Sequence, residues 1–233
     1  MLGREGAIVL ADAAVAYGVS EMTVRRDLLE MEQAGLVRRV RGGAVAVGPE
    51  LFQRRLSTAG AAKQAIARKM LPLVPHSGSI ALDASSTIYQ FAVEMNPGAL
   101  TVLSTGIETT GVLSRSGKAR VLMSGGEVQE STGALVGALT ISSIERFVFN
   151  RAFVSPSCID PRLGLMESTM EGAEIKRALH KAARSYVVAV DSTKLGEVAT
   201  ARALDLADVD VLVTELDPAE SVLDEYRDRV ELL

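Results

Sequence analysis

The apolar positions in the first part of the chain predict a helix with one buried face. Val24, Leu28 and Met31 recur at i, i+4 and i+7, which is the spacing of a single stripe along a helix. Ser20 stands before this stripe and can accept an unpaired backbone N–H of the first turn, and Gly35 stands after it as a favourable C-terminal end. The pattern therefore predicts a helix between Ser20 and Gly35.

Further patterns on both sides of this helix predict a small domain. The segment DAAVAYG, residues 12–18, is typical of a short alanine-rich helix that ends at a glycine. After the longer helix, LVRRV, RGG and AVAV predict a strand, a glycine turn and a second strand. Together these elements predict a winged helix-turn-helix domain over residues 1–48, followed by a linker over residues 49–60.

Beyond residue 60, apolar strands alternate with helical segments. The expected strands are SIALD, LTVLS, RVLMSGG, RAFVS, SYVVAVD, DVLVTE and RVELL. Several are apolar almost throughout, as in a parallel sheet with both faces covered. The expected helices include AAKQAIARKML, TIYQFAVEM, EGAEIKRALHKAAR and PAESVLDEYRD. This alternation predicts an open, mostly parallel α/β domain over residues 61–233.

The charge is distributed unevenly between these two parts. The whole chain has a net charge of −4, but residues 1–48 contain six arginines and six acidic residues and are neutral in sum. Five arginines lie within 17 residues of that segment, namely Arg25, Arg26, Arg38, Arg39 and Arg41. Because phosphates meet the local patch rather than the whole chain, an acidic protein of this kind can still bind DNA.

Several classes of protein are disfavoured by the composition. The chain has no apolar run near the roughly 18 residues that a membrane span needs, and its N-terminus lacks the pattern of a signal peptide. We therefore expect a cytoplasmic location and no membrane partner. The single cysteine, Cys158, cannot form an internal disulfide, and His76 and His180 provide no cluster with metal-ligand spacing. Neither a metal nor another cofactor is expected.

The second predicted helix and the hairpin carry the chemistry needed to bind DNA. An arginine can donate two hydrogen bonds to guanine or bind a phosphate, and a threonine can contact a base methyl. Glycines in the hairpin would let backbone N–H groups approach a phosphate. Two adjacent arginines alone are more commonly a solvated part of a helix, but their combination with the N-cap, the apolar stripe and the basic hairpin favours DNA binding. The candidate DNA-binding residues are Ser20, Thr23, Arg25, Arg26, Arg38, Arg39, Arg41, Gly42 and Gly43.

The segment VSEMTVRRDLLEMEQAGLVRRVRGGAV resembles the N-terminal signature of the DeoR family of bacterial transcriptional repressors. The matching residues are Val19, Ser20, Thr23, Arg25, Arg26, Asp27, Leu28, Gly35, Arg39, Gly42, Gly43 and Ala44. Arg41 stands where the family usually has a histidine, which retains a donor and makes the position permanently cationic. The resemblance implies double-stranded operator DNA as a partner.

One feature of the N-terminus differs from the family pattern. Family members carry an additional first helix, and here only Met1 to Glu5 precede the segment GAIVLADAA. This departure implies either a start codon assigned too late or a weakened domain. We therefore expect lower order or lower thermal stability for residues 1–48 than for the rest of the chain.

Polar residues follow three of the predicted strands in the larger domain. Asp83 ends one strand, and Ser85, Ser86 and Thr87 begin the next helix, where backbone N–H groups and hydroxyls can bind a phosphate. An ordinary capped helix is the alternative interpretation. The segments LSTG and MSGG also follow strands, and ligands of open parallel sheets bind at these carboxyl ends.

The resemblance to the DeoR family continues through this domain. Lys63, DASST, LSTG, SGG, RAFVSPSCID, EGAEIKR and VDSTKLG are similar in order to its effector domain, whose fold is related to ribose-5-phosphate isomerase and which senses a phosphorylated sugar. By this likeness the phosphate would be bound by Lys63, Ser85, Ser86 and Thr87, although Ser85 stands where the family often has glycine. The sugar end or the pocket wall would be formed by Asp83, Thr105, Gly106, Gly125, Gly126, Lys176 and Lys194. For each lysine the alternative is a solvated surface charge.

Three functions are compatible with the sequence. We expect a regulator, a repressor of a sugar-metabolism operon that acts as a homodimer or homotetramer and responds to a phosphorylated sugar. The alternative is a sugar-phosphate isomerase or deaminase, but the acidic run of the related isomerases is replaced here by SPSCID, which leaves Asp160 and, on the following helix, Glu171. We therefore do not expect an enzyme. A sensor that no longer binds DNA is the third interpretation.

Overall fold

The computed structural model describes residues 7–33, 37–46, 52–117 and 119–233. The chain divides into two compact units, Met1–Thr58 and Ala59–Leu233. Met1 to Glu5, on which the expectation of a missing first helix rests, lie outside the described residues, as does Gly35. No helix among the described residues is long and apolar enough to cross a membrane.

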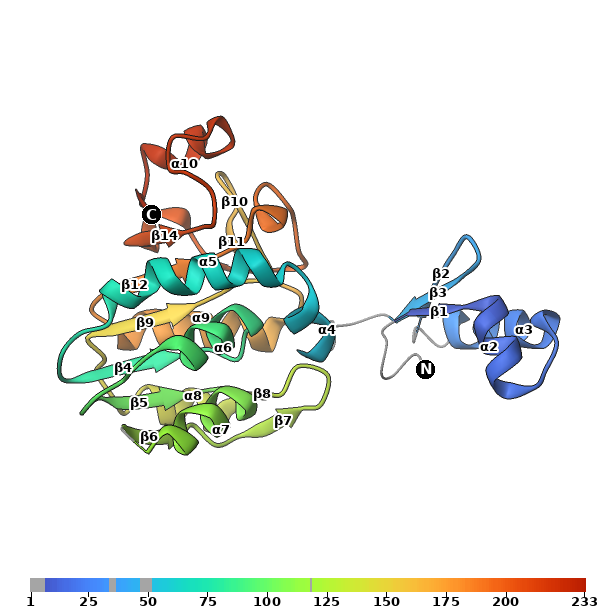
Figure 1. The fold of residues 1–233 in the computed structure, drawn as a ribbon, viewed down its shortest axis with the longest axis horizontal. Coiled ribbons are helices and arrows are strands. Elements are labelled where there is room, and N and C mark those ends of the chain that lie inside the picture. Colours follow the sequence, from blue (N-terminus) through green and yellow to red (C-terminus); the bar gives the residue numbers. More distant parts are fainter. Residues whose placement is uncertain (1–6, 34–36, 47–51, 118) are drawn as a thin grey trace. The chain divides into compact units, whose positions relative to one another are not determined.

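Within residues 7–46, the N-terminal unit combines two helices with a three-stranded antiparallel sheet. Its elements are β1 (Ala7–Val9), α2 (Leu10–Tyr17), α3 (Glu21–Gln33), β2 (Val37–Val40) and β3 (Gly43–Ala46), with strand order β1-β3-β2 (Figure 1). Val24 and Leu28 are buried and Met31 packs against them, which confirms the predicted stripe of α3. The hairpin of β2 and β3 is confirmed, whereas β1 is an additional strand that the sequence analysis did not predict.

The additional strand explains one of the two glycines of the hairpin. Gly43 lies opposite Val9 of β1, and a Cβ atom built on Gly43 would lie 1.9 Å from the carbonyl oxygen of Ile8. Any side chain here would therefore push β1 away. Gly43 is buried, and the absence of a side chain there is required for strand packing, a role that the sequence analysis did not predict.

The segment expected as a linker is partly helical. Residues 47–51 lie outside the described residues, and helix α4 (Phe52–Ser57) follows them. The division between the two units falls after this helix, between Thr58 and Ala59.

A seven-stranded parallel sheet forms the centre of the larger unit, and its strands are the seven that the sequence predicts. They are β4 (Ser79–Leu82), β5 (Thr101–Ser104), β6 (Arg120–Met123), β9 (Arg151–Val154), β12 (Tyr186–Ala189), β14 (Val211–Val213) and β15 (Glu231–Leu232). Their order in the sheet is β15-β14-β12-β9-β4-β5-β6 (Figure 1). The predicted α/β class is therefore confirmed.

Both faces of this sheet are covered by apolar packing. Ile80 and Leu82 of β4 belong to one core cluster, together with residues of α5 (Gly60–Met70), α6 (Ser86–Glu94) and α7 (Ile107–Ser116). Ala81, between them on the strand, belongs to the other cluster, with α8 (Ala138–Ile144) and α9 (Met170–Ala182). Because successive side chains of a strand point to opposite faces, the strands must be apolar at every position.

Smaller elements lie beside the main sheet. A hairpin joins β7 (Glu127–Gln129) to β8 (Ala134–Val136), and β10 (Cys158–Asp160), β11 (Gly164–Glu167) and β13 (Ala201–Leu204) form an antiparallel sheet. None of these strands was predicted. The helix expected over residues 218–228 was wrong in extent, because only a 3-10 turn (Ser221–Leu223) and the short helix α10 (Asp224–Arg227) form there.

Candidate functional site

The start of α3 is organised by its N-terminal serine. The Oγ atom of Ser20 accepts the backbone N–H of Thr23 at 3.2 Å and lies 3.0 Å from the Thr23 hydroxyl. The predicted N-cap is therefore present. Arg25 and Arg26 follow on the solvent-exposed side of α3, with Arg26 only at the limit of ion-pair distance from Asp27, at 4.0 Å.

The arginines of the hairpin have different surroundings. Arg38 and Arg41 are exposed, and Gly42 between the strands has a left-handed φ of +85°. Arg39 is held by α3, because its Nε donates to the Glu32 carboxylate at 2.7 Å and its backbone N–H donates to the same carboxylate at 2.9 Å. These two hydrogen bonds hold the pKa of Glu32 below its usual value.

The candidate effector residues of α6 lie at the carboxyl edge of the main sheet. The hydroxyl oxygen of Ser85 accepts the backbone N–H of Ile88 at 3.2 Å, so Ser85 is the N-cap of α6. Ser86 and Thr87 occupy the first turn, and the side chains of all three residues are buried. Lys63, near the start of the neighbouring helix α5, is buried as well, with 4% of its surface exposed.

Asp83 joins the ends of two neighbouring strands. One carboxylate oxygen accepts the backbone N–H of Ser85 at 2.9 Å, and the other accepts the backbone N–H of Ser155 at 2.7 Å. The second oxygen also lies 2.8 Å from the ammonium group of Lys176 on α9. Asp83 is completely buried, so these partners replace the water that a carboxylate needs.

Lys176 is not a solvated surface charge. Only 7% of the residue is exposed, and its ammonium group lies between Asp83 and Glu167, 3.0 Å from the latter. Burial alone would lower the pKa of Lys176, but the two carboxylates outweigh burial and hold this pKa above its usual value. Lys176 therefore remains charged, and its ammonium group is paired with two carboxylates.

Ser155 connects three of the predicted residues and was not itself predicted. Its backbone N–H binds Asp83, and its hydroxyl lies 3.3 Å from the Thr87 hydroxyl. The ammonium group of Lys194 donates to the same hydroxyl at 3.1 Å and to the carbonyl of Pro156 at 3.0 Å. The structure thus brings Asp83, Thr87 and Lys194 together around the end of β9.

The loop after β5 is engaged with the hairpin of β7 and β8. The backbone N–H of Leu135 donates to the carbonyl of Thr105 at 2.7 Å, and Gly106 forms a bridge with Ala134. The N–H of Gly106 donates to the Ser104 hydroxyl at 3.1 Å. Thr105 and Gly106 therefore shape the edge of the site through their backbones.

The loop after β6 is shaped by close packing against α8. Gly126 has a φ of +115°, and a Cβ atom there would lie 1.9 Å from the Thr140 hydroxyl oxygen. The same hydroxyl donates to the carbonyls of Gly125 at 2.7 Å and Val136 at 2.9 Å. Gly126 is thus needed for the loop to approach α8, and Thr140 is a further site residue that the sequence analysis missed.

The two carboxylates considered for catalysis have other surroundings. Asp160 accepts the backbone N–H groups of Arg162 and Leu163, both at 2.8 Å, in the turn between β10 and β11. These hydrogen bonds hold the pKa of Asp160 below its usual value despite some desolvation. Glu171 is exposed in the first turn of α9. Asp160 is thus occupied as the acceptor of a turn, and Glu171 lies on the surface of α9.

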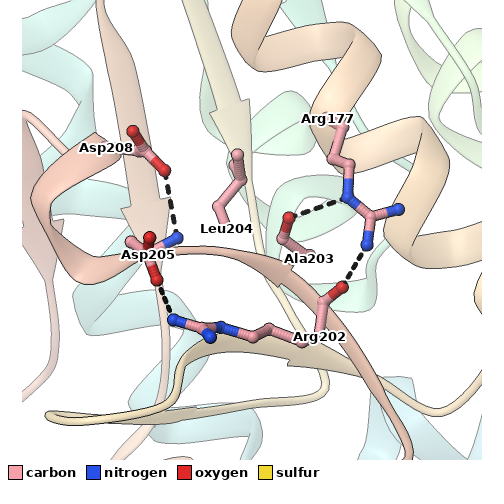
Figure 2. A pocket seen from close by; sticks show the side chains of 6 residues that line it. All are labelled: Arg177, Arg202, Ala203, Leu204, Asp205 and Asp208. Carbon is pink, nitrogen blue, oxygen red and sulfur yellow. Dashed lines mark hydrogen bonds and ion pairs between the residues drawn. The ribbon is translucent and has the colours of Figure 1, made fainter.

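A separate pocket of about 200 Å³ lies between α9, β13 and the following turn. Figure 2 shows that its charged side chains are bound to neighbouring backbone groups or, for Arg202 and Asp205, to each other. The Nε of Arg177 donates to the carbonyl of Ala203 at 3.0 Å, another of its nitrogens donates to the carbonyl of Arg202, and Arg202 is paired with Asp205. Within the described residues, no group of three histidine, cysteine or acidic residues could hold a metal ion.

Comparison with known proteins agrees with this architecture. The DeoR C-terminal sensor domain matches residues 58–216, and the DeoR-like helix-turn-helix domain matches residues 1–50. The HTH-type transcriptional regulator GolR of Listeria innocua is 30% identical over 220 residues, which cover 92% of this chain and 87% of GolR. The glycerol-3-phosphate regulon repressor of Escherichia coli is 25% identical over 227 residues, which cover 96% of this chain and 90% of that protein.

Among solved structures, ribose 5-phosphate isomerase A from Neisseria gonorrhoeae is similar over 59% of this chain and 53% of its own, with 15% identity and a TM-score of 0.41. The two domain matches together span both units of the chain, and the relatives are aligned over nearly its full length. The protein therefore belongs to the DeoR family of transcriptional regulators.

Proposed function

We propose that this protein is a cytoplasmic repressor of a sugar-metabolism operon whose binding to operator DNA is controlled by a phosphorylated sugar. The observation that carries the effector part of the proposal is the start of α6, where Ser85, Ser86 and Thr87 are buried at the carboxyl edge of a parallel sheet. Three successive hydroxyl-bearing residues thus place polar groups, rather than apolar side chains, at this buried edge.

The start of α6 has the chemistry of a phosphate site. Backbone N–H groups in the first turn of a helix have no intrahelical acceptor, and the helix dipole favours an anion there. The Ser85 hydroxyl oxygen accepts the backbone N–H of Ile88. The backbone N–H groups of Ser86 and Thr87 would then bind the phosphate oxygens. Lys63, at the start of the adjacent helix α5, would add a positive charge.

The remaining effector candidates would form the sugar end or the wall of the pocket. Lys194 and the hydroxyls of Ser155 and Thr87 form a continuous polar strip next to α6, suited to sugar hydroxyls. Lys176 and Asp83, which are buried and paired with each other, would support the wall from behind. The backbones of Thr105 and Gly106 and the glycines Gly125 and Gly126 would bound the opposite side.

The DNA part of the proposal rests on α3 and the hairpin. The exposed arginines Arg25, Arg26, Arg38 and Arg41 would contact bases and phosphates, with Thr23 and Gly42 beside them. One winged domain contacts little DNA, so a homodimer or homotetramer would be needed for tight specific binding. The name of the Escherichia coli relative, a glycerol-3-phosphate regulon repressor, supports the repressor part of the proposal.

A thermal-shift screen tests the effector. Sugar phosphates should raise the melting temperature of the full-length protein in a saturable manner, whereas the same sugars without phosphate should not. Ser86→Ala should weaken this response, and Ser114→Ala, which removes an exposed hydroxyl on α7, should leave it unchanged. Equal responses to phosphorylated and free sugars would contradict a phosphate site at α6.

A mobility-shift assay tests the regulator. The protein should retard the DNA upstream of its own operon, and the sugar phosphate found in the screen should change the amount of retarded DNA. Retardation without any effect of the ligand would contradict the proposed control. Robust isomerisation of phosphorylated pentoses or hexosamines would instead support the enzyme.

A further inference from the structure

Three charged side chains are buried together behind the start of α6. Asp83 directly follows β4, Lys176 lies on α9, and Glu167 ends β11, so each comes from a different part of the fold. The Lys176 ammonium group lies 2.8 Å from Asp83 and 3.0 Å from Glu167. Two carboxylates and one ammonium group leave this buried cluster with one excess negative charge.

The excess charge lies close to the place proposed for the phosphate. Asp83 accepts the backbone N–H of Ser85 at 2.9 Å. Because Ser85 is the N-cap of α6, the Asp83 carboxylate lies next to the first turn of this helix. A buried carboxylate there repels a phosphate dianion, since like charges interact strongly where water is excluded. The positive charge of Lys176 offsets the charge of one carboxylate, and the second carboxylate leaves the cluster with a net negative charge.

Glu167 does not itself hold the α6 loop. Its second carboxylate oxygen accepts the Ser157 hydroxyl at 2.8 Å, and neither Ser157 nor its other described partner, Lys176, belongs to α6. Asp83, in contrast, also binds the backbone of Ser85 and Ser155. Removal of the Glu167 charge therefore affects two described partners, the Ser157 hydroxyl and the Lys176 ammonium group, and leaves the described contacts of Asp83 with the α6 loop in place.

We propose that Glu167 and Lys176 are positioning residues that set the affinity of the effector site for anions, by fixing the net charge of the cluster behind α6, without contacting the effector. This inference rests on the proposed phosphate site. It assigns Lys176 a different role from direct binding of the sugar. It also makes Glu167 a residue that weakens phosphate binding in the natural protein.

Three variants of the full-length protein separate the electrostatic role from direct contact. Counting each carboxylate as −1 and the ammonium group as +1, the formal charge of the cluster is −1 in the natural protein, 0 in Glu167→Gln, −2 in Lys176→Met, and −1 again when both changes are combined. We expect Glu167→Gln to tighten binding of inorganic phosphate and ribose 5-phosphate on the order of tenfold, and Lys176→Met to weaken it by a similar factor. The double variant should bind both probes with nearly the natural affinity.

Calorimetric titration with the two probes at constant ionic strength measures these affinities. Rescue of Lys176→Met by Glu167→Gln supports the proposal, because a lysine that touched the ligand could not be replaced by removing a distant carboxylate. The proposal would be overturned if Lys176→Met and the double variant bound the probes equally weakly. It would also be overturned if Glu167→Gln bound them with unchanged or lower affinity. If Lys176→Met fails to fold by circular dichroism, the result for Glu167→Gln alone decides.

The natural protein distinguishes failure of this inference from failure of the proposed function. Absence of saturable binding by the natural protein to every sugar phosphate of the screen would refute the phosphate site, and the inference with it. Saturable binding by the natural protein, combined with affinities that do not follow the net charge, would refute the inference alone.

Discussion

The carboxylate of Glu32 on α3 receives two hydrogen bonds from Arg39 on β2, one from the guanidinium Nε at 2.7 Å and one from the backbone N–H at 2.9 Å. This pair ties the predicted recognition helix to the hairpin. Arg39 matches the family signature and was expected to contact DNA. In the structure its first role is to fix the angle between the two elements that would meet the DNA.

Removal of this carboxylate should loosen the N-terminal unit. We expect Glu32→Gln to lower the melting temperature of residues 7–46 and to weaken operator binding, because α3 and β2 lose their charged connection. Glu30→Gln removes an exposed carboxylate from the same helix and serves as the control. Hydrogen exchange of α3 and β2 provides the measurement. Equal exchange in the two variants would show that the pair contributes nothing.

The same pair predicts a dependence on pH. Hydrogen bonds from Arg39 hold the pKa of Glu32 below its ordinary value of 4.5 in the folded protein. A depressed carboxylate pKa stabilises the folded state above the ordinary value, and this contribution is lost as the pH falls through the lowered one. The difference in melting temperature between the natural protein and Glu32→Gln should therefore be full near pH 6 and shrink below about pH 4.5. A difference that grows on acidification would contradict this sign.

The strands of the main sheet could be predicted because burial on both faces leaves a local signal. Ile80 and Leu82 pack on one side of the sheet and Ala81 on the other, so the whole segment is apolar. The antiparallel strands β10, β11 and β13 carry no such signal. Each is three or four residues long, and β11 ends in Glu167, whose buried carboxylate is paired with Lys176 of α9.

The candidate site shows the same division. Asp83 and the hydroxyls of α6 were predicted because residues after a parallel strand lie at a known edge of the sheet. Ser155 follows β9 and could have been found by the same rule. Thr140 and Glu167 could not, since their roles depend on contacts with Gly125 and Lys176 from other elements. The DNA and effector assignments of individual residues stay predictions.

Gly126 provides a test of the loop that bounds the site. Alanine at this position would combine a left-handed φ of +115° with a Cβ atom 2.7 Å from the backbone oxygen of Val136. We expect Gly126→Ala to lower the free energy of unfolding by about 2–4 kcal/mol. Gly98 also has a left-handed φ, of +54°, but a Cβ atom there would meet no described atom within 4 Å. Gly98→Ala should therefore lower the free energy of unfolding by only about 1 kcal/mol. Urea denaturation compares the two, and equal losses would refute the close packing against α8.

The two units should also differ in protection from hydrogen exchange. The described core of the N-terminal unit consists of Ile8, Leu10, Ala13, Val24, Leu28, Val37 and Ala44, two of them alanines. The parallel sheet has larger clusters on both of its faces. Because local stability follows buried apolar contacts, amides of α2 and α3 should exchange faster than those of β4, β9 and β12. Uniform protection across both units would contradict this expectation.

Arg26 should contribute to DNA binding without contributing to folding. Its side chain is exposed on α3, and its ion pair with Asp27 is long, at 4.0 Å, so truncation disturbs no close contact among the described residues. If Arg26 reads a base, Arg26→Ala should weaken operator binding by about 1–3 kcal/mol and relax specificity at that position. Arg115→Ala, an exposed arginine of α7, removes the same charge from the sensor unit and should leave the affinity unchanged. Mobility shifts at several salt concentrations separate two roles for Arg26. Loss of a phosphate contact lowers the salt dependence of binding, whereas loss of a base contact changes the preferred sequence. Equal affinities of the natural protein and both variants would exclude Arg26 from the DNA interface.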